Sequence, residues 1–329
     1  MKHLFIINPT AARLGGGNLE NMRQEIEAFF AANPRICHEV HVTRWKRDAT
    51  GFVRRFVSRS GELVRVYAVG GNGTLFEVVN SCACVPNVQV AFLPMGRNNT
   101  ALNSFGGKGF LFRSLWNLST AGVISLDLIH AGDCYSLTGC CIGAGVAHER
   151  ESAVEASPHK EEAETAVRPA RLIERLFLPR RLYVQTLSFM ELVKQNSARY
   201  QIEIDGESLD GEYLNILVAN TPAASGQHPA VWTAMADGAL DLYLIKQPPA
   251  RRLARIVSDF AFGRYHAWAE YFIHRRGKSV SISGDAARHV TVDEERFYTS
   301  SPFSLDFRLV PQSIDFVLPG GIGTPRGFV

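Results

Sequence analysis

The fold of this chain is decided by the stretch Leu63-Val64-Arg65-Val66-Tyr67-Ala68-Val69-Gly70-Gly71-Asn72-Gly73-Thr74-Leu75-Phe76-Glu77-Val78-Val79-Asn80. It begins as an apolar, β-branched run, passes through glycines and continues as a helical pattern. Glycines let a backbone approach an anion closely, and the free amide groups at the start of a helix point toward it. The order of strand, glycine turn and helix therefore predicts a phosphate-binding turn at residues 70–74. The structural alternative is a tight turn whose glycines only supply positive φ angles.

Strand and helix patterns alternate on both sides of this turn. Strands are expected at residues 3–7, 37–42, 63–69 and 88–93, and helices at 19–32, 49–60, 74–81, 99–105 and 111–118, with a loop at 8–17. Because parallel strands need crossover connections and helices supply them, this alternation predicts a doubly wound α/β domain over residues 1–124.

From residue 124 onward the pattern changes to short strands joined by turns such as Asp205-Gly206 and Asp237-Gly238. Strands are expected at 124–130, 135–142, 200–204, 213–219, 239–245, 279–283, 289–292, 304–309 and 313–317, and helical segments near 170–196 and 250–262. Asp-Gly is a strong hairpin signal, so Asp205-Gly206-Glu207 is interpreted as a hairpin turn. Residues 125–319 are therefore predicted to form an antiparallel β-sandwich, followed by a tail at 320–329.

Three polar turns follow strands of the expected parallel sheet: Asn8-Pro9-Thr10, the glycine turn at 70–74, and Pro94-Met95-Gly96-Arg97-Asn98-Asn99. Ligands bind at the carboxyl ends of the strands in open α/β sheets, so we expect the three turns to face one site. Thr43, at the end of the second strand, and Glu77, one turn into the helix, are expected on the same rim. Each feature alone also fits a plain loop or a solvated helix charge.

The composition is that of a soluble globular protein: 329 residues, 46% hydrophobic and 20% charged. The net charge of +3 is too small to indicate a nucleic-acid partner. The six cysteines show neither a C-x-x-C pair nor zinc spacing, so free thiols are expected. No apolar run is long enough to span a bilayer and no signal peptide is expected, which predicts a cytoplasmic protein.

Taken together, these motifs resemble the diacylglycerol kinase catalytic-domain family, which includes bacterial lipid kinases and sphingosine and ceramide kinases. The family's Asn-Pro-x-Ser/Ala-Gly loop is similar to residues 8–11, and its Gly-Gly-Asp-Gly-Thr signature with Glu-x-x-Asn is similar to residues 70–74 with Glu77 and Asn80. Its Pro-x-Gly-Thr-x-Asn loop resembles residues 94–99, its Asp-Asp-Gly-x-Leu-Asp turn residues 236–241, and its late Asp-Gly-Glu residues 293–295. The resemblance runs from His3 to about Pro319.

The resemblance implies an active cleft between a nucleotide-binding α/β domain and a lipid-binding sandwich. There the γ-phosphoryl group of ATP would pass to the hydroxyl of diacylglycerol or a related lipid alcohol, with Mg²⁺. Glu295 would be the general base, Asn72 would stand at a catalytic position, and Asn72 and Asp237 would be the metal positions. The nucleotide-binding positions that the resemblance implies are Asn8, Thr10, Thr43, Gly70, Gly71, Gly73, Thr74, Glu77, Gly96 and Arg97.

Four residues depart from the family pattern: Asn72 replaces Asp, Arg97 a small hydroxyl residue, Ala236 Asp, and Glu294 Gly. Mg²⁺ prefers charged oxygen ligands and Asn72 supplies no charge, whereas Arg97 could serve as a fixed cation or block the pocket. The alternative function is therefore a catalytically impaired nucleotide- or lipid-binding protein, and a kinase of soluble substrates such as NAD is a third. If only the metal contact is lacking, Asn72→Asp should raise Mg-dependent activity.

Residues 168–182 mix basic and large apolar side chains. This pattern fits either a helix that rests on an anionic lipid surface or an ordinary amphipathic helix packed on the sandwich. Peripheral contact with the inner membrane surface is accordingly left open, as is a homo-oligomer.

Overall fold

The computed structural model describes residues 1–14, 19–32, 36–96, 99–105, 108–143, 197–222, 233–249, 252, 255, 268–286, 288–320 and 322. Arg97, the basic segment 168–182 and the helix expected near 170–196 lie outside these residues. The helix expected near 250–262 lies outside them too, apart from the single positions 252 and 255.

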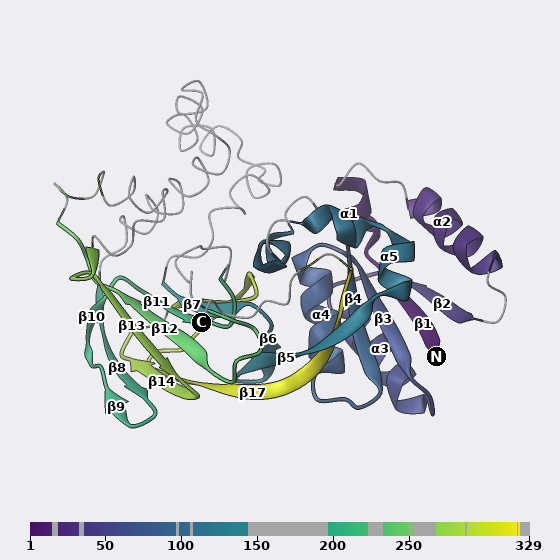
Figure 1. The fold of residues 1–329 in the computed structure, drawn as a ribbon. Coiled ribbons are helices and arrows are strands. Elements are labelled where there is room, and N and C mark those ends of the chain that lie inside the picture. The colour runs from purple at the N-terminus through teal and green to yellow at the C-terminus, as the bar shows by residue number, and fades with distance from the viewer. Residues whose placement is uncertain are drawn as a thin grey trace, which may run out of the picture.

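The first part of the chain forms a parallel sheet with helices between its strands (Figure 1). The elements are β1 Lys2–Ile7, α1 Pro9–Leu14, α2 Leu19–Ala31, β2 Cys37–Val42, α3 Asp48–Arg59, β3 Val64–Gly70, α4 Asn72–Cys82 and β4 Val88–Pro94. The strand order is β4-β3-β1-β2 with parallel pairing throughout. Every residue of β3 is buried, as a central parallel strand covered on both faces requires. The predicted α/β architecture is confirmed.

The prediction of a loop at residues 8–17 was wrong over residues 9–14, because α1 occupies Pro9–Leu14. The Asn8 Oδ1 atom accepts hydrogen bonds from the Thr10 and Ala11 amides at 3.0 and 3.3 Å. Asn8 therefore caps this helix, and Pro9 takes the first helical position, where its missing N–H costs nothing. The Asn-Pro pair was a helix-start signal.

Three short helices follow β4: η1 Thr100–Phe105 and η2 Gly109–Arg113, both 3₁₀, and α5 Leu115–Thr120. The prediction of a single helix at residues 111–118 was wrong, because η2 and α5 are separated at Ser114. The Ser114 side chain accepts a hydrogen bond from the Asn117 amide and so starts a new helix.

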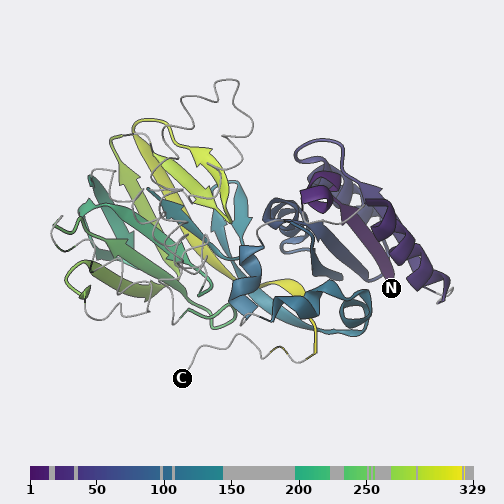
Figure 2. The same cartoon turned by 90° about the horizontal axis from the view of Figure 1, so that it is seen from above.

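The second part of the chain is an antiparallel sandwich, as predicted (Figure 2). Its six-stranded sheet has the order β13-β12-β11-β7-β15-β16, and the facing strands belong to the sheet that continues from the first part. The strands are β5 Gly122–Ala131, β6 Cys134–Ser136, β7 Gly139–Ile142, β8 Ala198–Ile204, β9 Glu207–Ser208, β10 Gly211–Tyr213, β11 Asn215–Ala219, β12 Leu240–Ile245, β13 Phe272–Gly277, β14 Ser279–Gly284, β15 His289–Val292, β16 Glu295–Tyr298 and β17 Phe303–Leu318.

The last strand, β17, joins the two parts into one sheet of eleven strands. It pairs antiparallel with β14 and β5, and its Asp315 and Phe316 then pair parallel with Gln89 and Val90 of β4. Two strands were expected here, but one strand with a register shift between Val310 and Ile314 is present. A domain boundary at 124/125 remains a prediction, and the end of β17 packs in the core of the first part.

Two further expectations concern local structure. The strand expected at 135–142 is split into β6 and β7, which belong to different sheets. The Asp205-Gly206 hairpin is confirmed between β8 and β9, with φ angles of 47° and 89°.

All six cysteines are free, as expected, and Cys82, Cys140 and Cys141 are buried. No helix in the described part of the chain is both long and apolar enough to cross a membrane.

Candidate active site

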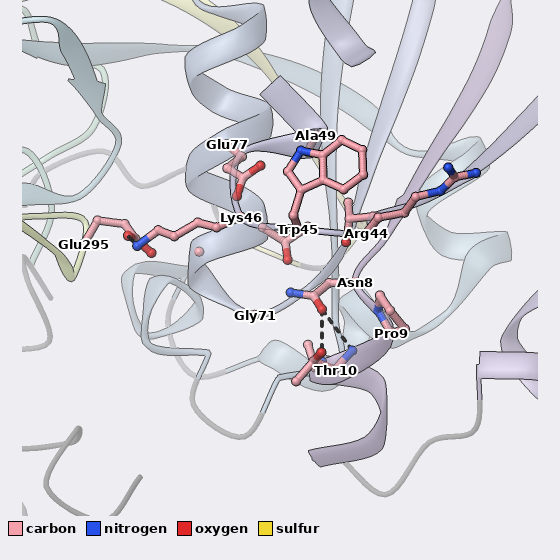
Figure 3. A pocket seen from close by; sticks show the side chains of 14 residues that line it. Asn8, Pro9, Thr10, Arg44, Trp45, Lys46, Ala49, Gly71, Glu77 and Glu295 are labelled. Atoms are coloured by element: carbon pink, nitrogen blue, oxygen red, sulfur yellow. Dashed lines mark hydrogen bonds and ion pairs between the residues drawn. The ribbon is translucent and has the colours of Figure 1, made fainter. Parts of the chain in front are cut away.

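A cavity of about 440 Å³ lies at the carboxyl ends of β1, β2 and β3 (Figure 3). We call it the strand-end cavity. Three loops from the α/β part line it, and Glu295 at the start of β16 reaches it from the sandwich. The lining residues are Asn8, Pro9, Thr10, Ala11, Thr43, Arg44, Trp45, Lys46, Ala49, Gly71, Gly73, Thr74, Glu77 and Glu295.

The glycine turn is shaped by close packing. A Cβ atom on Gly96 would lie 2.6 Å from Gly71 Cα, and one on Gly70 would lie 2.3 Å from Thr74 Oγ1. The Gly70 carbonyl accepts hydrogen bonds from the Met95 and Gly96 amides at 2.8 and 3.1 Å, which holds the 94–99 turn against it. None of Gly70, Gly71, Gly73 or Gly96 has a positive φ, so the alternative of a turn that needs left-handed glycines is wrong.

The first turn of α4 contributes Gly73 and Thr74 to the cavity lining. Gly71 precedes this eleven-residue helix in an extended conformation and has no side chain to bond the first amides. Those amides have no partners within the helix, and the helix dipole places partial positive charge there. The turn therefore has the features of an anion site, with Asn8 and Thr10 across the cavity from it.

Glu295 contacts two parts of the cavity wall. One of its carboxylate oxygens lies 2.8 Å from Lys46 Nζ, and the other lies 3.0 Å from where a Gly73 Cβ atom would be. Figure 3 shows the Lys46 and Glu295 side chains directed at one another. The Glu295 side chain is 25% exposed and the Lys46 side chain 73% exposed. A carboxylate from the sandwich is thus held beside the start of α4.

Glu77 lies deeper in the same cavity. Its Oε1 atom accepts a hydrogen bond from the Arg47 amide at 2.9 Å, and the backbone amides of Ala49 and Thr50 also face the carboxylate. Burial raises the pKa of the Glu77 carboxyl, and the nearby charge of Glu295 raises it further. A carboxyl group with a raised pKa in a cavity is typical of a functional site.

Asn72 does not line the strand-end cavity. Its Nδ2 atom donates to Thr100 Oγ1 and to Glu294 Oε2, both at 2.7 Å, and the Thr100 hydroxyl donates to Glu294 Oε1. We call these three residues the Asn72 cluster. They line a separate cavity of about 10 Å³, the space of roughly one water molecule.

Asp293 fixes the turn that carries both glutamates. Its buried carboxylate accepts hydrogen bonds from the Ser136 hydroxyl, from the Leu137 amide and from the amide and hydroxyl of Thr138, each at 2.7 Å. The turn between β15 and β16 is therefore tied to the loop between β6 and β7. Asn80 ties α4 to β6, because its side chain exchanges hydrogen bonds with the Tyr135 backbone.

Asp237, the second predicted metal position, is engaged by protein groups. Its carboxylate forms an ion pair with Arg276 and accepts a hydrogen bond from the Ala239 amide at 3.2 Å. Arg276 also lies 3.5 Å from the fully buried carboxylate of Asp241, so one guanidinium already pairs with both carboxylates of this turn. Among the described residues, no three His, Cys, Asp or Glu side chains are grouped as a metal site.

The structure thus brings Asn8, Thr10, Thr43, Gly71, Gly73, Thr74, Glu77 and Glu295 into one cavity, with Gly70 and Gly96 packed behind it. Asn72 and Asp237 lie outside that cavity, and Arg97 lies outside the described residues. The sequence interpretation missed Arg44, Trp45 and Lys46, which follow Thr43 directly. Their position could have indicated a role in the site, because they form a run of basic and aromatic residues at the end of a parallel strand. Trp45 is 65% exposed and offers its indole face at the cavity rim.

Comparison with known proteins agrees with this architecture. Residues 2–130 match the family model of the diacylglycerol kinase catalytic domain, and residues 165–318 match that of the YegS C-terminal NAD kinase beta sandwich-like domain. A diacylglycerol kinase of Staphylococcus saprophyticus is 26% identical over 252 residues, 75% of each chain. One of Staphylococcus carnosus is 25% identical over 257 residues, 78% of this chain and 77% of that one.

Shorter and more distant similarities complete the comparison. The protein YtlR of Bacillus subtilis is 29% identical over 111 residues, and the match spans 34% of its length. A crystal structure of a diacylglycerol kinase from Bacillus anthracis str. Sterne superposes with a TM-score of 0.68 at 19% identity and covers 98% of both chains, which shows a shared fold. The chain belongs to the diacylglycerol kinase catalytic-domain family, as its motifs indicated. This family is a family of lipid kinases.

Proposed function

We propose that this protein transfers the γ-phosphoryl group of ATP to the hydroxyl of diacylglycerol or a related lipid alcohol. The observation that carries the proposal is the position of Glu295, which the sandwich delivers to the cavity beside the amides that begin α4. A donor phosphate and an acceptor hydroxyl could be brought together at this place, where the two parts of the chain meet. The site is proposed to work at the cytoplasmic face, with peripheral membrane contact for access to lipid.

The residues of the strand-end cavity have separate proposed roles. Asn8, Thr10, Thr43 and Thr74 supply hydrogen bonds to the nucleotide, and Gly71 and Gly73 let phosphates approach the helix start. Lys46 supplies positive charge for the phosphates. Trp45 offers an aromatic surface for the base.

Glu295 is the proposed general base. A base must lie within hydrogen-bond reach of the hydroxyl whose proton it takes, and a partly exposed carboxylate at the cavity mouth can do so. Lys46 holds this carboxylate in place through their ion pair. When phosphates attract Lys46, the carboxylate is released to accept the proton.

The test is incorporation of labelled phosphate from ATP, with Mg²⁺, into a panel of diacylglycerol, ceramide, sphingosine and monoacylglycerol presented in mixed micelles. ATP-dependent labelling of one lipid, lost in the Glu295→Gln variant, is the expected result. Labelling of NAD with none of any lipid would contradict the proposal.

The second candidate is a nucleotide- or lipid-binding protein without turnover. It is favoured by the neutral Asn72 at a position where the family signature carries a carboxylate. This function predicts measurable ATP affinity, lipid affinity or both, and no labelled product from any lipid of the panel.

A further inference from the structure

The Glu77 carboxylate faces backbone amides at the start of the neighbouring helix α3. It accepts a hydrogen bond from the Arg47 amide at 2.9 Å, and the amides of Ala49 and Thr50 also face it. Helix α3 has no side-chain cap of its own at Arg47. The first amides of a helix lack partners within it, and an acidic group beside them stabilises the helix. Glu77, which belongs to α4, therefore caps α3 from outside.

The Arg47 backbone has a conformation that residues with side chains rarely adopt. Its φ and ψ angles are 68° and 9°, in the left-handed region. Such a conformation persists where surrounding contacts fix it, and the Arg47 amide is the donor of the hydrogen bond to Glu77. This hydrogen bond therefore holds the bend at which the chain enters α3.

The residues before this bend, 43–47, form a loop that we call the β2–α3 loop. Three of its members that sequence analysis missed line the strand-end cavity (Figure 3): Arg44, Trp45 and Lys46. The loop is closed by Asp48, whose carboxylate accepts a hydrogen bond from the Arg44 amide at 3.0 Å and whose amide donates to the Trp45 carbonyl at 3.3 Å. Asp48 thus maintains the shape of the loop, and Glu77 attaches the loop to α4.

We propose that Glu77 is a positioning residue, which holds the β2–α3 loop at the strand-end cavity so that Trp45 and Lys46 meet the nucleotide. The inference rests on the proposed function, and it replaces the direct nucleotide contact that the family resemblance implies for Glu77. A carboxylate repels phosphate oxygens, whereas a carboxylate that faces amides can assist phosphate binding through the loop that it holds. Because Lys46 also pairs with Glu295, the same attachment helps to place the proposed base.

The rest of α3 is held independently of Glu77. Val53 and Val57 are buried in the core of the α/β part, and the Arg54 guanidinium donates to the Asn80 carbonyl on α4 at 3.1 Å. Loss of the Glu77 acceptor is therefore expected to loosen the β2–α3 loop and the first turn of α3 while the protein remains folded.

The first experiment measures amide hydrogen exchange of the peptide that covers residues 44–50, without nucleotide. Glu77→Met removes the acceptor oxygens and keeps the side-chain length, whereas Glu77→Gln keeps one acceptor oxygen. Glu25→Met makes the same change at an exposed position of α2 and is the matched control. We expect exchange in Glu77→Met to be about tenfold faster or more, since a hydrogen bond to a charged group is lost. Glu77→Gln should stay within a few-fold of the wild type, and the control should match it.

The second experiment tests whether Glu77 acts through Trp45. The affinity for a non-hydrolysable ATP analogue is measured by calorimetry, with Mg²⁺ and separately with EDTA, in the wild type, Glu77→Met, Trp45→Ala and the double variant. We expect each single variant to bind about tenfold more weakly, and Trp45→Ala to cost no more than about threefold once Glu77 is Met. Glu77→Gln should bind within a few-fold of the wild type.

Unchanged exchange of residues 44–50 in Glu77→Met would overturn the inference, as would an equal cost of Trp45→Ala with and without Glu77. Binding by Glu77→Gln as weak as that of Glu77→Met, with wild-type exchange, would show that Glu77 acts on the nucleotide directly and would also overturn it. If the wild type binds no analogue under either condition, the proposed function fails. The exchange measurement uses no nucleotide and separates that failure from a failure of Glu77 to hold the loop.

Discussion

The strand-end cavity and the Asn72 cluster lie on opposite faces of the first two turns of α4. Gly71, Gly73, Thr74 and Glu77 face the cavity, whereas Asn72 faces Thr100 and Glu294. On the cavity face the residues follow the family pattern. On the other face two of them depart from it, and those two are hydrogen-bonded to each other.

This difference separates two tasks. The cavity face offers backbone amides, small residues and positive charge, which suit phosphate groups. The opposite face joins the α/β part to the sandwich through side chains, and a change on one partner can be balanced by a change on the other. A departure from a motif therefore has to be judged together with the residue that it contacts.

The largest expected effect is that of Glu295→Gln, which removes the carboxylate shared by both parts of the chain. We expect kcat for lipid phosphorylation to fall by about 10²–10⁴-fold, the usual worth of a general base. Affinity for the ATP analogue should stay within a few-fold, because the cavity amides remain. Initial rates and calorimetry measure the two quantities. Unreduced turnover would remove Glu295 from the mechanism.

Gly96→Ala tests the packing behind the cavity. A Cβ atom there would lie 2.6 Å from Gly71 Cα, so one of two backbones must move. Overpacking costs about 1–3 kcal/mol of stability, and because the displaced turn lines the cavity, nucleotide affinity should fall as well. Gly61→Ala is the control, because a Cβ on Gly61 meets no atom within 4 Å. Equal affinities of the two variants would show that the close approach of the turns does not shape the site.

Trp45→Ala tests the rim of the cavity. Stacking of a base on an aromatic side chain is worth about 1–3 kcal/mol, so we expect nucleotide affinity to fall roughly tenfold. Trp45→Phe should retain most of it. The measurement is titration with the ATP analogue and with inorganic triphosphate, which has no base. A loss of triphosphate affinity as large as the loss for ATP would rule out stacking.

Thr100→Val tests the opposite face alone. It keeps the shape of the side chain but removes the hydroxyl that bonds Asn72 and Glu294. We expect the free energy of unfolding to fall by about 1–2 kcal/mol, measured by urea denaturation. Nucleotide affinity in EDTA should not change. If affinity in EDTA fell instead, the two faces of α4 would not be independent.

The smallest expected effect is a gain in stability from Glu77→Gln. The folded-state pKa of Glu77 lies above its ordinary 4.5, so the wild type loses stability as pH rises from about 4.5 through that raised pKa. The variant has no such loss, and its Tm should exceed the wild-type Tm by about 2 °C at pH 7.5 and match it near pH 4. Thermal melts across this range measure the difference. A gap that is independent of pH would exclude the buried charge as its cause.

The strand-end cavity was largely predictable because its signals are local. Each turn follows an apolar strand, and the carboxyl ends of parallel strands share one edge, so Thr10, Gly71 and Gly96 could be expected close together. The capping role of Asn8 was also encoded locally, in the Asn-Pro pair, although the loop prediction passed over it.

What could not be predicted depends on contacts between distant parts of the chain. The ion pair between Lys46 and Glu295 and the bond between Asn72 and Glu294 exist only because the sandwich packs against α4. Strand β17 likewise joins both parts through a parallel pairing with β4, and no local sequence pattern predicts that pairing. Motif order could suggest that Glu294 departs from a pattern, but not that its carboxylate accepts a hydrogen bond from Asn72.

The most direct test is a crystal structure of the wild-type protein with a non-hydrolysable ATP analogue. We predict that the phosphates of the analogue lie against the amides of residues 71–74. An analogue seated elsewhere on the molecule would contradict the account.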